Sequence, residues 1–429
     1  FAIDCRNTFN FYHFVVESLS QLCLVAETGL TGPIYFHFPN DDSKTRPFVL
    51  GFIEALFPEL ADRVVFQRAP CHHPSVVYPY NFGPSYYQMP EVESAGLDDF
   101  APSDLAWEGR SASRNSQGML VMNSVDSSLY KLRDRALRAI EGKDFSHLPR
   151  RFWIGREAEQ ARNRDMKGEA ELLAMLQLFG FEQLTFESLS PLEQIGLMAN
   201  AEMMVSYHGA GFANMLFANP KATVIELGTL QTATTRWGDF WRCANVSQCR
   251  YVSFFADYNS ETPLVDPVFT QDSIVPVHLS KAGLAQVMGF VVALLGKLPE
   301  LKRPEDIHRL AAQLVEVGEA AKARDLLEMH AAVIAGDLDC QLSLAAACEA
   351  LEDRPAQLSA LYAAYRIEPS RWLTLVSVIW CARALDDLDT VHAALEVFRE
   401  GFPEAFDGFA KDRPWIKAQL QRLPRRAAR

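Results

Sequence analysis

A histidine stands in a glycine-flanked turn, Tyr207-His208-Gly209-Ala210-Gly211, between a segment typical of a strand and one typical of a short helix. Gly209 and Gly211 can adopt backbone angles that other residues resist, which would let the main chain approach a ligand closely. The following helix would direct free N–H groups and the positive end of its dipole at the turn. These features suit a diphosphate, although glycines at such a turn can equally serve tight packing.

Alternating strand and helix patterns surround this turn. The predicted strands are "RFWIG", "FEQLTF", "AEMMVSY" and "ATVIEL", and the predicted helices are Gly168–Leu178, Pro191–Met198 with Ser190 as N-cap, and Gly211–Phe217. Such units build a doubly wound sheet, which binds ligands at the carboxyl ends of its strands. His208 is therefore expected at that edge.

An earlier region, from Phe1 to about Asn81, alternates in the same way. Its predicted helices are Phe11–Glu27 and Phe48–Phe57, and its predicted strands are "PIYFHF", "RVVFQ" and "SVVYPY". Residues Gly83 to Gln117 carry no periodicity and are predicted to be a long loop. The fold class is thus α/β, with two sheet-containing domains at residues 1–125 and 126–280 and a cleft between them.

From about Ser280 onward, the pattern is helical. Three helix pairs recur every 32 to 33 residues or so, with first helices beginning near Leu310, Leu342 and Leu375. The second helices align through Leu326, Leu358 and Val391. We expect residues 281–429 to be an all-α domain, either of tetratricopeptide-like repeats or a plain bundle.

The composition limits the classes of function. The formal net charge of −13 argues against nucleic acid as a partner. The eight cysteines show no zinc-ligand spacing, so we expect no metal site and reduced thiols in the cytoplasm. We find no apolar run of membrane-spanning length. Because the chain begins at Phe1 rather than Met, we expect that it starts inside a longer product.

The central block closely resembles the signature of glycosyltransferase family 61. It reads "FGFEQLTFESLSPLEQIGLMANAEMMVSYHGAGFANMLFANPKATVIEL" over residues 179–227. Upstream, Phe11-Tyr12-His13-Phe14 with Glu17 is similar to another family element, and "WIGR" and "ARNR" supply arginines in the family's order. Downstream, "WGDFWRCANVSQCRYVSF" is similar to a further one. The motifs span Asn10 to Phe254, over half of the chain.

This resemblance implies a GT-B pair of Rossmann-like domains and an inverting transfer from a nucleotide diphosphate sugar, usually without an essential metal. The departing diphosphate would be held by Gly209, Ala210, Gly211 and His208, and by Arg156, with Arg162 and then Arg164 as alternatives. Each arginine could instead make a surface salt bridge.

The resemblance also implies roles for other residues. Glu17 matches the family's acidic position and shares a helix face with His13, so it is the first candidate for the general base. His13 and His208 are the other candidates. Asn214 would donate to a phosphate or cap the turn, and Glu226 would accept from ribose hydroxyls. The family generally has Asp-Glu-Leu-Pro where this chain has Glu17-Ser18-Leu19-Ser20.

The sequence thus predicts a bacterial, metal-independent glycosyltransferase that uses a UDP-sugar and a glycan or protein acceptor, in polysaccharide biosynthesis. We expect it in the cytoplasm, where it could be peripheral at the inner membrane. The carboxyl-terminal helices are candidates for a protein partner or self-association. The altered motif after Glu17 favours the main alternative, a degenerate transferase domain that serves as a scaffold. A phosphotransferase ranks lower because the sequence has no P-loop.

Overall fold

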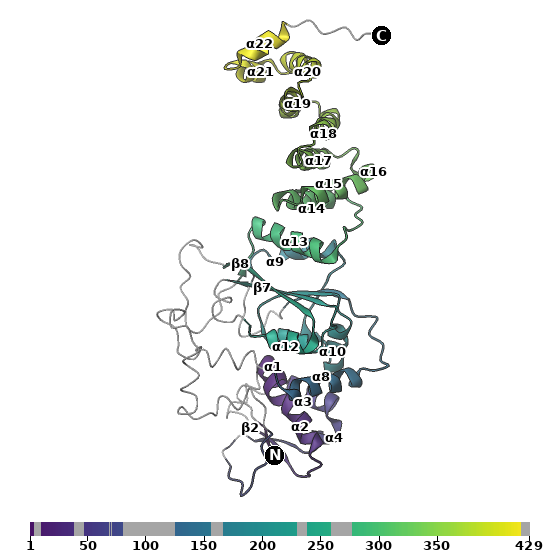
Figure 1. Ribbon diagram of the computed structural model, residues 1–429, viewed down its shortest axis with the longest axis vertical. Coiled ribbons are helices and arrows are strands. Elements are labelled where there is room, and N and C mark those ends of the chain that lie inside the picture. Colours follow the sequence, from purple (N-terminus) through teal and green to yellow (C-terminus); the bar gives the residue numbers. More distant parts are fainter. Residues whose placement is uncertain are drawn as a thin grey trace, which may run out of the picture. The chain divides into compact units, whose positions relative to one another are not determined.

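The computed structural model describes residues 1–3, 10–37, 47–67, 69, 71–79, 125–155, 166–229, 238–258 and 277–421. It divides into two compact units (Figure 1). The first comprises Phe1–Leu173 and Gly180–Ser280, and the second comprises Ala174–Phe179 and Lys281–Arg429. The predicted boundary between residues 125 and 126 lies inside the first unit and stays a prediction, whereas the predicted long loop lies outside the described residues.

The first unit begins with a three-stranded parallel sheet in the order β1-β2-β3. The strands are β1 (Ala2–Ile3), β2 (Ile34–His37) and β3 (Val64–Gln67). Its helices are α1 (Phe11–His13), the π-helix η1 (Phe14–Leu19), α2 (Ser20–Glu27), α3 (Pro47–Leu56) and α4 (Pro58–Ala61). The predicted strands over "PIYFHF" and "RVVFQ" are confirmed. The one predicted over "SVVYPY" is wrong, because its described residues 75–79 form no strand.

A six-stranded sheet follows, in the order β5-β4-β6-β7-β8-β9. Its strands are β4 (Arg151–Ile154), β5 (Glu182–Leu184), β6 (Met203–Tyr207), β7 (Thr223–Thr229), β8 (Arg250–Tyr258) and β9 (Val277–His278). All neighbours pair in parallel except β8 and β9, which are antiparallel. The strand order reverses between β4 and β6, so their carboxyl ends form the switch point where doubly wound sheets bind ligands.

Helices connect these strands. They are α8 (Ser127–Ala139), α9 (Glu169–Gln177), the 3₁₀ turn η6 (Phe186–Ser188), α10 (Pro191–Ala199), the 3₁₀ helix η7 (Ala210–Phe217) and α12 (Trp241–Ser247). The predicted start of α10 is confirmed: Ser190 caps it in a capping box with Glu193, and Pro191 is its first residue. The helix predicted after the histidine turn is 3₁₀ rather than α-helical.

One hydrophobic core runs through both parts of the first unit. Phe14 and Phe52, from the helices of the first sheet, belong to the same buried cluster as Phe152 of β4 and Phe217 of η7. The helix α2 packs against α8, and α3 packs against α10. The chain is therefore a mixed α/β protein with parallel sheets. The more specific pair of Rossmann-type domains stays a prediction.

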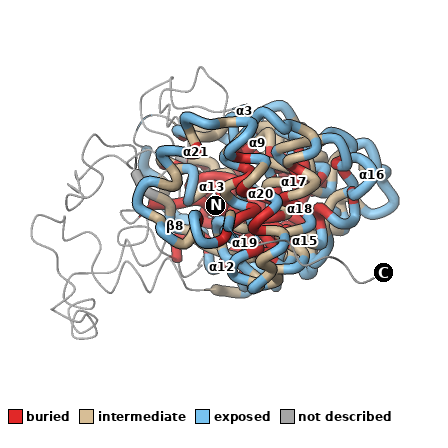
Figure 2. Tube along the Cα trace, turned by 90° about the horizontal axis from the view of Figure 1, so that it is seen from above, coloured by how far each residue is buried: buried red, intermediate tan, exposed pale blue. Residues whose placement is uncertain are grey.

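The second unit consists of helices in its described part. They are α13 (Lys281–Leu295), α14 (Pro304–Glu316), α15 (Ala320–Met329), α16 (Ala331–Ile334), α17 (Leu338–Ala350), α18 (Arg354–Ile367), α19 (Trp372–Ala384), α20 (Leu388–Gly401), α21 (Pro403–Ala410) and α22 (Pro414–Leu420). Buried stretches mark helices such as α13, α19 and α20 (red in Figure 2).

Three helix hairpins in this unit, α14/α15, α17/α18 and α19/α20, repeat with a spacing of 34 residues. Their first helices begin at Pro304, Leu338 and Trp372, and their second helices at residues 320, 354 and 388, each 34 residues after the one before. The predicted period was short because it was aligned on the wrong residues. The buried positions that correspond in the second helices are Leu327, Leu361 and Leu395.

Candidate active site

The first component of the site is the helix that begins after Asn10. The Asn10 side chain accepts hydrogen bonds from the backbone N–H of Tyr12, at 3.0 Å, and of His13, at 3.5 Å, which fixes the start of the helix. The π-helical segment η1 then widens the backbone spacing. The Gln21 side chain donates to the Glu17 carbonyl at 2.7 Å. Such π segments occur frequently at functional sites.

His13 and Glu17 lie one turn apart on this helix, and they contact each other as predicted. His13 Nδ1 is 2.7 Å from Glu17 Oε1. The Glu17 side chain is 3% exposed and that of His13 is 14% exposed. Glu17 therefore lies behind the imidazole and can accept the Nδ1 proton, while the ring is the more accessible part of the pair.

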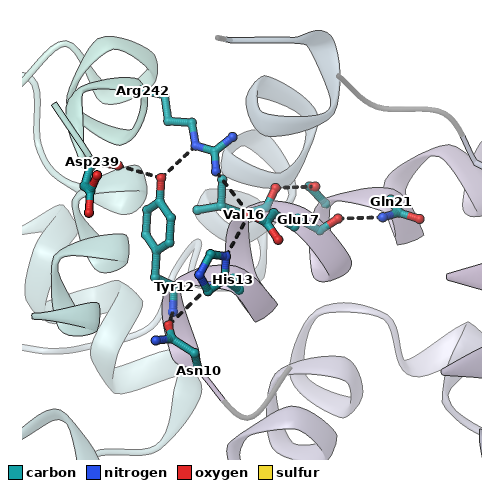
Figure 3. Close-up of polar contacts among 9 residues, drawn as sticks. Asn10, Tyr12, His13, Val16, Glu17, Gln21, Asp239 and Arg242 are labelled. Atoms are coloured by element: carbon teal, nitrogen blue, oxygen red, sulfur yellow. Dashed lines mark hydrogen bonds and ion pairs between the residues drawn. The ribbon is translucent and has the colours of Figure 1, made fainter. Parts of the chain in front are cut away.

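A buried arginine, which the sequence analysis missed, approaches this pair from α12. Arg242 Nη2 lies 3.7 Å from Glu17 Oε1, and Arg242 Nε donates to the Tyr12 hydroxyl at 2.9 Å. The Tyr12 hydroxyl in turn donates to the Asp239 carbonyl at 2.5 Å. Figure 3 shows these side chains turned toward one another. The signal for them lay in the downstream family segment, where Asp239 and Arg242 are charged residues among aromatic ones.

Burial affects the ionisation of these groups. It raises the pKa of Tyr12, so the phenol keeps its proton and acts as a donor. Burial alone would lower the pKa of Arg242, but the Tyr12 oxygen and the Glu17 carboxylate outweigh it and raise that pKa. The guanidinium is therefore a permanent positive charge beside a buried carboxylate.

The second component is the turn after β6, at the switch point of the larger sheet. The explanation predicted for its glycines is wrong in part. Gly209 has an extended backbone with φ 179°, which any residue adopts, and Gly211 serves packing, since a Cβ there would lie 3.0 Å from the Phe186 ring. None of the described residues accepts a hydrogen bond from the backbone N–H groups of Gly209, Ala210 and Gly211, which are partly exposed.

The predicted donor residues His208 and Glu226 bond to each other. His208 Nδ1 contacts Glu226 Oε1 across β6 and β7, and the Tyr251 hydroxyl of β8 donates to the other Glu226 oxygen. All three residues are largely or fully buried. Burial, reinforced by Glu226, raises the pKa of Tyr251, so its hydroxyl remains a donor. Tyr251 was not predicted, because its distance from Glu226 in sequence gives no sign of the contact.

Phe240 joins the two components. Its ring centroid lies 5.4 Å from that of Tyr12, 5.1 Å from that of His208 and 5.2 Å from that of Phe212. The segment Gly238–Arg242 therefore contacts the histidine of the turn through Phe240 and the His13–Glu17 pair through Arg242. This brings together residues that are about 200 positions apart in sequence.

Other predicted residues lie elsewhere or cannot be placed. Asn214 is fully buried in η7, where its amide donates to Gln194 Oε1 at 3.2 Å, so its proposed phosphate contact stays a prediction. Arg156, Arg162 and Arg164 lie outside the described residues, although Arg156 follows β4 closely, at the switch point.

Two further features concern metals and membranes. Among the described residues, no group of three or more His, Cys, Asp or Glu side chains is placed to hold a metal ion. In the same part of the chain, none of the helices is both long and apolar enough to cross a bilayer.

Comparison with known proteins gives one match. The family model described as glycosyltransferase 61 matches residues 11–225, which is half of the chain. The match covers His13, Glu17, the β6 turn with His208, and the three arginines, and it ends one residue before Glu226. No curated protein matches the sequence.

Proposed function

Because this chain belongs to glycosyltransferase family 61 and is a glycosyltransferase, we propose that it transfers a sugar from a nucleotide diphosphate sugar to a hydroxyl acceptor. The turn at Gly209–Gly211 would lie on the donor side and His13 on the acceptor side. The observation that carries this assignment is the shared contact of both components with the segment Gly238–Arg242. A transferase needs its base and its leaving-group site close together.

On the donor side, the unpaired backbone N–H groups of Gly209, Ala210 and Gly211 support binding of a diphosphate. They precede a helix, whose amino-terminal end favours negative charge. Arg156, with Arg162 and Arg164 as alternatives, would add charge-assisted hydrogen bonds to the phosphate oxygens. The buried Glu226 holds His208 in orientation, and this contact supports a positioning role for Glu226 rather than the ribose contact expected from sequence.

On the acceptor side, His13 would be the general base, with Glu17 as its partner. The Nδ1 proton is held by Glu17, so Nε2 would take the proton of the acceptor hydroxyl. The acceptor oxygen then forms a bond to the anomeric carbon. The bond from that carbon to the diphosphate breaks, and its electron pair leaves on the phosphate oxygen. Sequence reasoning favoured Glu17 for this step, but the greater exposure of the His13 ring supports the imidazole.

The finer assignments rest on the family resemblance. We propose an inverting, metal-independent transfer from a UDP-sugar, in bacterial surface glycan or glycoprotein synthesis in the cytoplasm, with the possibility of peripheral attachment to the inner membrane. The 34-residue spacing of the helix hairpins supports the tetratricopeptide-like assignment for the second unit. Repeats of this kind would suit a protein partner or self-association. The absence of a nucleic-acid partner stays a prediction.

A UDP-sugar panel tests the proposal. We expect UDP or a UDP-sugar to raise the melting temperature of the chain, and one of the sugars to support UDP release. His208→Ala should reduce the thermal shift, because it removes a side chain from the donor turn. His13→Ala should keep the thermal shift but lower transfer by about 100-fold or more, the usual contribution of a general base.

The matched control is His147→Ala, because His147 is a more exposed histidine paired with Glu193. It should leave both the thermal shift and the rate unchanged. The alternative, a scaffold without catalysis, predicts no UDP release with any donor in the panel. Equal loss of activity in all three variants would contradict the assignment of His13 and His208.

A further inference from the structure

Arg242 has an unusual environment for an arginine. Its side chain is 3% exposed, and its guanidinium stacks against the Tyr12 ring with 5.3 Å from Cζ to the ring centroid. Nε is bonded to the Tyr12 hydroxyl, whereas Nη2 has no hydrogen-bond partner in the described part of the chain. Burying such a charge is costly unless it is paired. The nearby Glu17 carboxylate at 3.7 Å supplies the compensating charge.

We propose that Arg242 is a positioning residue whose positive charge beside Glu17 stops the His13–Glu17 pair from holding an extra proton at neutral pH. The role of His13 as base rests on the proposed function, but the effect of Arg242 on proton binding by the pair does not. Arg242 would act through Glu17, because its printed contacts are with Glu17 and Tyr12 rather than with His13.

The charges explain the expected direction. With Arg242 in place, the Glu17 carboxylate already has a cationic partner, and an imidazolium on His13 would be a second positive charge in the same buried cluster. Without Arg242, the carboxylate has His13 as its remaining ionic partner among its printed contacts, and it attracts a proton to the pair. The pair would then stay protonated to higher pH, and a protonated base cannot accept the acceptor proton.

The other titratable groups that face this cluster do not replace that charge. Burial raises the pKa of Tyr12, and it raises the pKa of the Cys243 thiol to about 12, so both are neutral at pH 7. Asp239 interacts electrostatically with Tyr12 and carries the opposite charge. His208 lies beyond the Phe240 ring, bonded to Glu226. The Arg242 guanidinium is thus the cation in contact with Glu17 that does not titrate near neutrality.

The orientation of Arg242 depends on Tyr12. The Tyr12 hydroxyl accepts from Nε and donates to the Asp239 carbonyl, which holds the plane of the guanidinium against the helix of His13. Tyr12→Phe keeps the aromatic ring and the apolar packing but removes both hydrogen bonds. It should therefore produce a smaller change in the same direction as loss of Arg242.

The test is an NMR titration of the full chain with ¹³C-labelled histidine, in which the His13 signal is assigned from its loss in His13→Gln. In Arg242→Gln, we expect the titration midpoint of the pair to rise by about one pH unit or more. In Arg242→Lys, which keeps the charge, the midpoint should stay within a few tenths of a unit of the parent. Tyr12→Phe should fall between the two and provides the measurement if Arg242→Gln does not fold.

The control is Arg151→Gln, which removes another partly buried arginine paired with a carboxylate, that of Glu202, at the opposite end of β4. It should not move the His13 signal. An unchanged midpoint in folded Arg242→Gln, or in folded Tyr12→Phe if the former does not fold, would overturn the proposal.

The pH–rate profile separates this inference from the proposed function. If His13 is the base, the acidic limb of the profile moves to higher pH together with the NMR midpoint. A moved midpoint with an unmoved limb would keep the role of Arg242 and reject His13 as the base.

Discussion

At the scale of residues, the site depends on pairs of buried polar groups that satisfy one another. His208, Glu226 and Tyr251 form such a group across three neighbouring strands, and all of their printed bonds are between side chains. Buried polar groups are costly when unpaired, so removing one member leaves its partner unsatisfied. The group therefore fixes the histidine in one orientation at the end of β6.

Tyr251→Phe tests this group. It removes the hydroxyl that donates to Glu226 and leaves the ring in place. We expect the free energy of unfolding to fall by about 1.5–3 kcal/mol, the range for a hydrogen bond to a charged group. Urea denaturation measures this change. Tyr130→Phe, at an exposed tyrosine of α8, should change it by less than about 0.5 kcal/mol. Equal effects of the two substitutions would show that the Glu226 contact contributes nothing.

At the scale of elements, local signals decide where helices start. Ser190 and Glu193 form a complete capping box: the Ser190 side chain accepts from the Glu193 N–H at 3.4 Å, and Glu193 accepts from the Ser190 N–H at 2.8 Å. The Ser190 hydroxyl also donates to Glu193 at 2.6 Å. The helix that this box begins, α10, packs against η7, which follows the donor turn.

Ser190→Ala should lower the free energy of unfolding by about 1 kcal/mol at pH 7, the usual cost of losing such a cap. The bonds from Ser190 lower the pKa of Glu193 below its ordinary value of 4.5. Because the folded-state pKa is depressed, this contribution is complete above pH 4.5 and is lost as the pH falls through the lowered value. The difference between parent and variant in urea denaturation should therefore narrow in acid. A difference that grows with acidification would contradict the capping-box account.

At the scale of the whole molecule, the two units have separate hydrophobic clusters. One contains Phe14, Phe152 and Phe217, and the other contains Leu361, Leu395 and Phe398. Each unit can thus bury apolar surface within itself, which is the usual condition for domains that unfold separately. The helix hairpins of the second unit are the part that a partner would contact if the repeat assignment holds.

Leu395→Ala tests whether the units unfold separately. Leu395 is fully buried in the second unit, and the deletion should cost about 2–5 kcal/mol in that unit. In calorimetry, we expect the transition of the second unit to move to lower temperature, while the transition that UDP-sugar shifts stays in place. Leu373→Ala, at an exposed leucine of α19, is the matched control and should move neither. A single transition that moves as a whole would mean that the units unfold together.

The sequence alone determined the order of strands and helices, the capped start of α10, the shared face of His13 and Glu17, and the family of the chain. These depend on local periodicity and short spacings, which are readable within a few turns or strands. It also placed His208 at the end of β6. The exceptions at this level were the strand at "SVVYPY", the 3₁₀ geometry of η7 and the alignment of the repeats, where the apolar pattern allowed more than one interpretation.

Only the tertiary structure decided which distant side chains meet. Arg242 and Tyr251 follow His13 and Glu226 by long stretches of chain, and their partners depend on strand order and on how α12 packs against the first helix. The tertiary structure also showed that His208 and Glu226 bond each other and that Gly211 makes room for Phe186. Contacts of this kind come from three-dimensional packing, and no spacing within one segment encodes them.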